Sequence, residues 1–113
     1  MTWNLFIDDE RSPRDVTWGS PEFYWSFPWT FARTMAQAQS LIDMYGFPSF
    51  VSFDHDLGDG EPTGKDIANW MIEGDMDCTH RIPDDFQFFV HSRNPVGKAN
   101  IEGLLNSYLE QRE

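Results

Sequence analysis

Short apolar runs recur four times along the chain, and each is followed by polar or charged residues. They cover residues 3–7, 29–33, 49–53 and 86–90 and are rich in Phe, Trp, Ile and Val. Runs of this length and composition are typical of strands buried in a sheet. The third run is almost wholly apolar, as is usual for strands covered on both faces. We therefore predict four strands.

Apolar residues at helical spacing follow the last three of these runs, which predicts three helices. Each begins after a residue suited to capping: Thr34, Thr63 and Asn94. Gln37 completes a capping box with Thr34, and Pro95 suits the first position of the last helix. The apolar positions are, in chain order, Met35, Ala38, Leu41, Ile42, Tyr45, Ile67, Trp70, Met71, Ile101, Leu104, Leu105 and Tyr108.

Two segments fit neither pattern and are predicted to be loops. Residues 10–28 contain three prolines and no helical period, and long loops in compact domains are often functional. Their aromatic side chains could stack on a nucleobase, although closing a hydrophobic edge of the sheet is the favoured role. These aromatic residues are Trp18, Phe23, Tyr24, Trp25 and Phe27. The second predicted loop covers residues 74–85.

The order strand, loop, strand, helix, strand, helix, strand, helix predicts an α/β fold with a mostly parallel sheet. Right-handed crossovers then bring the carboxyl ends of all the strands to one edge. A chain of 113 residues, 40% of them apolar, is expected to form a single domain, residues 1–113, with a core of its own.

Composition narrows the class of protein. The net charge is −11, with 8 basic against 19 acidic residues, which argues against binding duplex nucleic acid. A small anionic ligand in a local basic pocket, or a divalent cation, remains compatible with that charge. The single cysteine excludes an internal disulfide, and no apolar run is long enough to span a membrane. We expect a cytoplasmic protein, monomeric or homodimeric.

Acidic residues follow the first and third predicted strands: Asp8 with Asp9, then Asp54 with Asp56. Because the carboxyl ends of parallel strands share one edge, we expect these carboxylates to lie close together. Crowded carboxylates repel one another unless a cation neutralises them, and oxygen ligands suit Mg²⁺ or Mn²⁺. Each pair taken alone is also compatible with a turn. An EF-hand calcium loop at 54–65 fits poorly, because its sixth and twelfth positions lack Gly and Glu.

Two histidines are expected at the same edge of the sheet, His55 after the third strand and His91 after the fourth. Each could transfer protons near neutral pH, ligate a metal or cap a helix. Hydroxyl groups, cations and a helix N-terminus at this edge suit the oxygens of a phosphate. The candidate phosphate-binding residues are Arg11, Ser92, Arg93, Asn94 and Lys98.

Four motifs give the chain a specific resemblance: LFIDDERSP, SFDHDLG, TGKDIANWMI and VHSRNPVGKANIEGLL. In this order they resemble the cyclic-phosphate processing receiver-like family, a divergent branch of the response-regulator receiver fold. The resemblance covers residues 4–109. It implies a receiver or flavodoxin-like three-layer sandwich whose four strands have the order 2-1-3-4, without the fifth strand of ordinary receivers.

The resemblance also implies an activity, namely metal-dependent opening of a cyclic phosphate on a nucleotide or RNA end by a phosphoesterase. Asp8, Asp9 and Asp54 are then expected to hold Mg²⁺ or Mn²⁺, and Asp56 to be a further ligand or a supporting carboxylate. His55 and His91, with Asp54, are expected to be catalytic. Either Asp54 or Asp56 matches the central aspartate of receivers. A phage protein acting on nucleotide immune signals, or RNA repair, is the setting that the family suggests.

Two other functions use the same residues. The first is a module that sequesters a cyclic nucleotide without cleaving it. The second is a degenerate receiver that accepts a phosphoryl group on aspartate. The expected lack of the fifth strand disfavours the second, because ordinary receivers carry a phosphoryl-pairing lysine at the end of that strand.

Overall fold

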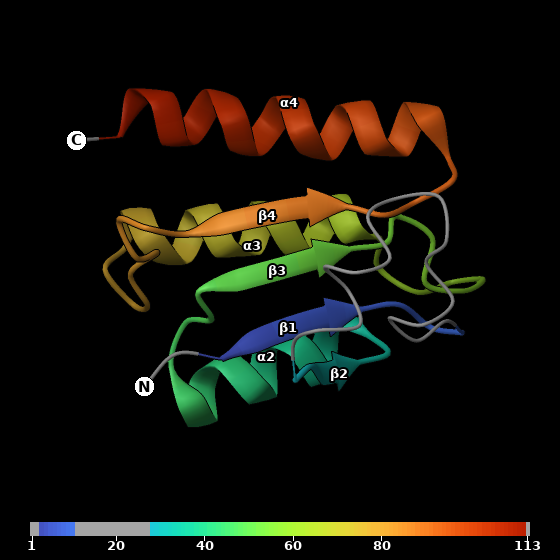
Figure 1. The fold of residues 1–113 in the computed structure, drawn as a ribbon, viewed down its shortest axis with the longest axis horizontal. Coiled ribbons are helices and arrows are strands. Elements are labelled where there is room, and N and C mark those ends of the chain that lie inside the picture. Colours follow the sequence, from blue (N-terminus) through green and yellow to red (C-terminus); the bar gives the residue numbers. More distant parts are fainter. Residues whose placement is uncertain (1–2, 11–27, 113) are drawn as a thin grey trace.

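A computed structural model describes residues 3–10 and 28–112 of the chain (Figure 1). The predicted strands and helices in this part are confirmed, with small shifts at their ends. They are β1 (Asn4–Ile7), β2 (Thr30–Ala32), α2 (Met35–Tyr45), β3 (Phe50–Phe53), α3 (Gly64–Met76), β4 (Gln87–Val90) and α4 (Pro95–Gln111).

The four strands form one parallel sheet in the order β2-β1-β3-β4, which confirms the predicted flavodoxin-like α/β fold. In Figure 1, α4 runs along the β4 side of the sheet and α2 along the β1–β2 side, with α3 between them. The crossovers through α2 and α3 proceed in the same direction across the sheet, so both helices cover the same face.

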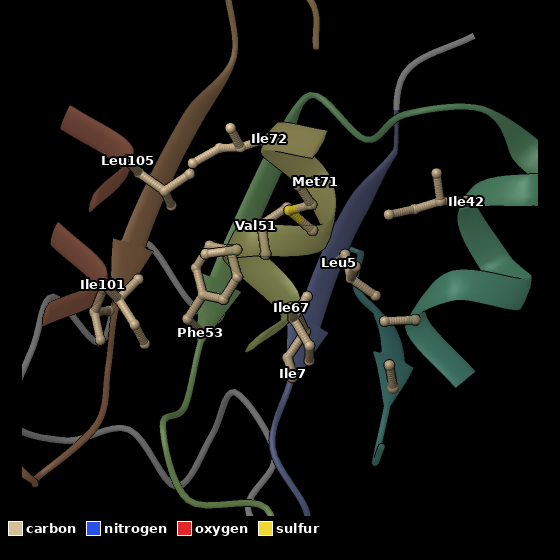
Figure 2. Close-up of a cluster of buried hydrophobic side chains, with 14 of the residues drawn as sticks. Leu5, Ile7, Ile42, Val51, Phe53, Ile67, Met71, Ile72, Ile101 and Leu105 are labelled. Atoms are coloured by element: carbon tan, nitrogen blue, oxygen red, sulfur yellow. The ribbon is translucent and has the colours of Figure 1, made fainter. Parts of the chain in front are cut away.

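The main core lies between the sheet and these three helices (Figure 2). Alternate strand residues, Leu5 and Ile7 on β1 and Val51 and Phe53 on β3, point toward the helices, as the two-residue period of a strand requires. The helices contribute Ile42, Ile67, Met71, Ile72, Ile101 and Leu105.

The strand residues that lie between these core positions face the other side of the sheet. There Phe6 is fully buried and packs with Trp29 and Phe89.

The helix starts follow the local sequence. The Thr63 side chain accepts a hydrogen bond from the Asp66 N–H and the Asp66 carboxylate accepts one from the Thr63 N–H, a full capping box at α3. At α2 the Thr34 side chain accepts from the Gln37 N–H, as predicted. The Gln37 side chain, however, accepts from the N–H of Arg33, one residue earlier than a capping box requires.

One predicted boundary is wrong. Residues 74–76 were expected to open a loop, but α3 continues through them to Met76. The ring of His80 packs against Gly74 within this helix, so that a Cβ atom there would lie 1.9 Å from His80 Nε2. The glycine makes room for a side chain and does not end the helix.

The long segment between β1 and β2 was predicted to be a functional loop. Its residues 11–27, which include Arg11 and the aromatic residues from Trp18 to Phe27, lie outside the described residues. Within the described part, no helix is both long and apolar enough to cross a membrane.

Candidate functional site

Three carboxylates meet where β1 and β3 end. Ile7 pairs with Phe53 in the parallel register, so the next residues, Asp8 and Asp54, lie side by side. Together with Asp9 they offer carboxylate oxygens that all lie within 4.8 Å of one another. Asp8 and Asp54 are buried. Three clustered oxygen donors fit Mg²⁺ or Mn²⁺, which favour carboxylates and retain several waters.

Backbone contacts fix Asp54 in this cluster. Its N–H donates to the carbonyl of Ile7 at 2.9 Å, and its Oδ1 accepts from the N–H of His55 at 2.8 Å. Asp56, by contrast, is exposed and lies outside the cluster. Of the two aspartates that match the receiver pattern, only Asp54 therefore belongs to the carboxylate cluster.

Asp8 is fixed at four of its atoms. Its N–H donates to the carbonyl of Ala32 at 3.1 Å, and its own carbonyl accepts from Arg33 Nη1 at 2.9 Å. Its Oδ1 accepts from the N–H of Glu10, and its Oδ2 lies 2.9 Å from His91 Nε2. Arg33 was not among the predicted site residues, although its place at the end of the second predicted strand, residues 29–33, was a usable clue.

His91 lies beneath the cluster and not in the pocket. Its ring is fully buried and stacks on Phe6, with 4.5 Å between the ring centroids and 9° between the planes. Its Nδ1 lies 2.7 Å from Ser52 Oγ. Ser52 was also missed, although a hydroxyl residue within the apolar run SFVSF was a usable clue.

His55 connects two loops at the rim of the site. Its Nδ1 lies 2.9 Å from Asp56 Oδ1, and Asp56 Oδ2 accepts from the side-chain amide of Asn94 at 3.2 Å. The hydrogen bond with His55, and then that with Asn94, lowers the pKa of Asp56. The ring of His55 packs closely against Gly97 in the first turn of α4, where a Cβ atom would lie 2.3 Å from His55 Cγ.

A pocket of about 450 Å³ opens above the carboxylates. Three of the predicted phosphate-binding residues, Ser92, Arg93 and Asn94, line it. Lys98 does not line it, and its Nζ instead lies 5.3 Å from the centre of the Phe89 ring. Arg11 lies outside the described residues. The full lining within the described chain is Asp9, Glu10, Asp54, Asp56, Gly58, Ser92, Arg93 and Asn94.

The backbone N–H groups at the start of α4 are largely hydrogen-bonded within the chain itself. The Asn94 side chain accepts from the N–H of Gly97 at 3.0 Å, and Ser92 Oγ accepts from the N–H of Asn94 at 3.1 Å. Pro95 has no N–H to offer. A phosphate would therefore meet the side chains of Ser92, Arg93 and Asn94 more than a row of backbone donors.

Comparison with known families identifies this arrangement. Residues 3–107 match the family described as the cyclic-phosphate processing receiver domain. The chain belongs to this family. The match spans every strand of this receiver domain and all described residues of its pocket. Neither the curated proteins nor the solved structures gave a match.

Charge limits what the pocket of this receiver domain can bind. Its described walls carry the carboxyl groups of Asp9, Glu10, Asp54 and Asp56 but, as a cation, only the guanidinium of Arg93. A phosphate placed here would be repelled by the surrounding carboxylates unless a cation were bound with it. The geometry is therefore suited to a phosphate ester that arrives together with, or after, a divalent ion.

Proposed function

We propose that this receiver domain is a metal-dependent phosphoesterase that opens a cyclic phosphate of a nucleotide or an RNA end. The observation that carries the proposal is the cluster of Asp8, Asp9 and Asp54 at a pocket that Ser92 and Arg93 also line. Membership of the cyclic-phosphate processing family supports it. RNA repair, or a phage protein countering nucleotide immune signals, is the setting we propose.

Asp8, Asp9 and Asp54 would hold Mg²⁺ or Mn²⁺, directly or through water. When bound, such an ion neutralises the charge of a phosphate and makes water more acidic. The chain's own donors would then orient the ester. The hydroxyl of Ser92 and the guanidinium of Arg93 suit its unesterified oxygens.

Asp56 and His55 are the groups placed to manage protons at the rim. Asp56 lines the pocket, and its carboxylate lies 2.9 Å from the ring of His55. The N–H on His55 Nδ1 donates to Asp56 and orients its carboxylate, which can take a proton from the attacking water. Asp56 then gives that proton to the leaving oxygen of the opened ring.

The direct test is turnover of a panel of 2′,3′-cyclic and 3′,5′-cyclic nucleotides, with and without Mg²⁺ or Mn²⁺. We expect hydrolysis that requires the metal and that falls by roughly 100-fold or more in Asp54→Asn, the scale of losing one transition-state-stabilising group. Asp59→Asn is the matched control, because Asp59 is an exposed acid of the same loop outside the pocket. No hydrolysis of any member under any of these conditions would overturn the proposal.

A second candidate is sequestration of a cyclic nucleotide without cleavage. The observation that favours it is that neither histidine of this edge lines the pocket in the described chain, so the usual proton-transfer group is not at hand. Incubation with a cyclic nucleotide, denaturation and mass spectrometry separates the two functions. Recovery of the intact ligand supports sequestration, and recovery of the opened product supports hydrolysis.

A third candidate is acceptance of a phosphoryl group. It is favoured by the place of Asp54, which directly follows β3 and belongs to the carboxylate cluster. A beryllofluoride adduct on Asp54 in the presence of Mg²⁺ would support this function, and a lack of any adduct would exclude it.

A further inference from the structure

Three buried polar side chains form a line beneath the pocket. Ser52, on β3, is 0% exposed; His91, just after β4, is 0% exposed; and Asp8, just after β1, is 1% exposed. Ser52 Oγ lies 2.7 Å from His91 Nδ1, and His91 Nε2 lies 2.9 Å from Asp8 Oδ2. Three strands thus supply one hydrogen-bonded chain that ends on a carboxylate of the cluster.

The partners of His91 determine which of its nitrogens carries hydrogen. A carboxylate can only accept, so the nitrogen that faces Asp8 must carry hydrogen. In the neutral ring the other nitrogen, Nδ1, is an acceptor, and a hydroxyl is a group that can donate to it. Ser52 therefore suits the tautomer that carries hydrogen on Nε2.

The ring has little freedom to do anything else. It lies parallel to Phe6 at stacking distance and is enclosed on all sides, and both of its nitrogens are engaged. The Asp8 carboxylate is hydrogen-bonded at both oxygens, to the N–H of Glu10 at Oδ1 and to His91 at Oδ2. A histidine in this position orients a carboxylate and does not reach a substrate.

We propose that His91 is a positioning residue: Ser52 supports the tautomer that Asp8 requires, and His91 in turn fixes the Asp8 carboxylate for the cation. The proposal replaces the expectation that His91 itself moves protons on the substrate. It rests on the proposed function for the presence of a cation at Asp8, but it does not require turnover. Partners that orient metal-binding side chains in this way are known to contribute about 10–100-fold to metal affinity.

The tautomer can be observed directly. The chain has three histidines, so nitrogen-detected NMR of the imidazole rings is simple to assign with single histidine variants. We expect the neutral ring of His91 to carry its hydrogen on Nε2 and to have a bare Nδ1 in metal-free protein. Hydrogen on Nδ1 alone would overturn the proposed tautomer.

The positioning role is tested by the affinity for Mn²⁺, measured by electron paramagnetic resonance of the free ion. His91→Phe preserves an aromatic ring beside Phe6 but removes both nitrogens, and we expect an affinity loss of about 10–100-fold. His91→Gln retains an N–H donor that can reach Asp8, so we expect it to recover most of the affinity. Native affinity in His91→Phe, or equal losses in both variants, would contradict the proposal.

Ser52→Ala provides a second test that removes a single oxygen from the same chain of hydrogen bonds. We expect a smaller loss of Mn²⁺ affinity and a shift of the His91 Nδ1 resonance, because this nitrogen loses its hydrogen-bond donor. Ser49→Ala is the matched control, because the Ser49 hydroxyl bonds the carbonyl of Trp3 just before the start of β3, away from the carboxylates. An unchanged Nδ1 resonance in Ser52→Ala would remove Ser52 from the proposal.

These readouts separate this inference from the phosphoesterase proposal. If no cyclic nucleotide is hydrolysed but the tautomer and the Mn²⁺ affinities behave as expected, the positioning role stands and the phosphoesterase proposal fails. If hydrolysis occurs while His91→Phe binds Mn²⁺ like the native chain, the reverse holds.

Discussion

Gly64, the first residue of α3, lies directly against the backbone of Asp54, the last carboxylate of the cluster. A Cβ atom at Gly64 would lie 2.0 Å from the Asp54 carbonyl oxygen. The N–H of Gly64 also donates to the carbonyl of His55 at 2.8 Å. Because the obstructing atom belongs to the backbone, it cannot move aside by changing rotamer. The position of Asp54 therefore depends on the lack of a side chain at Gly64.

Gly64→Ala is therefore expected to separate α3 from the end of β3. We expect the free energy of unfolding in urea to fall by about 1–3 kcal/mol, the usual cost of overpacking. Mn²⁺ binding should weaken as well, because Asp54 moves. Gly103→Ala in α4 is the control: nothing lies within 4 Å of its new Cβ, so better helix propensity should raise stability by up to about 1 kcal/mol. Native stability in Gly64→Ala would show that the contact imposes no constraint.

The sequence was sufficient to predict a parallel sheet and the edge at which its carboxylates cluster. Period-two and helical spacings are local properties, and the alternation of strands and helices fixes a parallel sheet whose carboxyl ends share an edge. For that reason the sequence alone predicted that the carboxylates after the first and third strands lie close together, as Asp8, Asp9 and Asp54 do. The caps at Thr63 and Asn94 were predictable for the same local reason.

The sequence could not determine which side chains at a strand end enter the pocket. His91 and Ser92 are adjacent, yet Ser92 lines the pocket while His91 turns beneath the sheet toward Ser52. This choice depends on the lateral register of three strands, which is a tertiary property. The same limit applied to Asp54 and Asp56, two residues apart, of which only Asp54 joins the cluster.

Gly74 illustrates how the local rule that glycine ends a helix fails where side-chain packing explains the glycine. Gly74→Ala should cost about 1–3 kcal/mol in the native background, because the new Cβ atom would meet the His80 ring. In a His80→Ala background the ring is gone, and the same change should be neutral or stabilising within a helix. Urea unfolding of the four proteins of this double-mutant cycle measures the coupling. Equal costs in both backgrounds would rule out the ring as the reason for the glycine.

Asp75 makes the stability of the C-terminal end of α3 sensitive to acid. Burial alone would raise its pKa, but hydrogen bonds from Tyr108, Ile82 and Arg112 outweigh that effect and lower the pKa from 3.8 to about 2. A carboxyl whose pKa is lower in the folded state stabilises the fold above its unfolded pKa. That stabilisation is lost as the pH falls from 3.8 toward 2.

We therefore expect Asp75→Asn to lose about 2 kcal/mol of stability near neutral pH, the equivalent of the pKa shift. Between about pH 4 and pH 2 its stability should fall less steeply than that of the native chain, as measured by urea unfolding at each pH. Asp84→Asn is the control, because Asp84 is fully exposed and its Oδ1 lies 3.5 Å from Arg112 Nη2. A parallel pH dependence in the native chain and Asp75→Asn would show that another group titrates.

The carboxylate cluster should cost stability when no cation is bound. Asp8, Asp9 and Asp54 place negative oxygens within 4.8 Å of one another, and Asp9 is the most exposed of the three. Removing its charge in Asp9→Asn should relieve the repulsion and raise the melting temperature in metal-free buffer. Asp59→Asn changes the net charge equally but lies outside the cluster, so it should leave the melting temperature nearly unchanged.

Saturating Mn²⁺ should reverse this order of melting temperatures. At a concentration about 100 times its Kd, a ligand that binds only the folded state stabilises it by about 3 kcal/mol. The native chain and Asp59→Asn should gain this increment in full, whereas Asp9→Asn should gain much less because it has lost one of three ligands. Thermal unfolding of the three proteins with and without the ion makes the comparison. An equal Mn²⁺ increment in Asp9→Asn would remove Asp9 from the metal site, and no increment in any of them would remove the site itself.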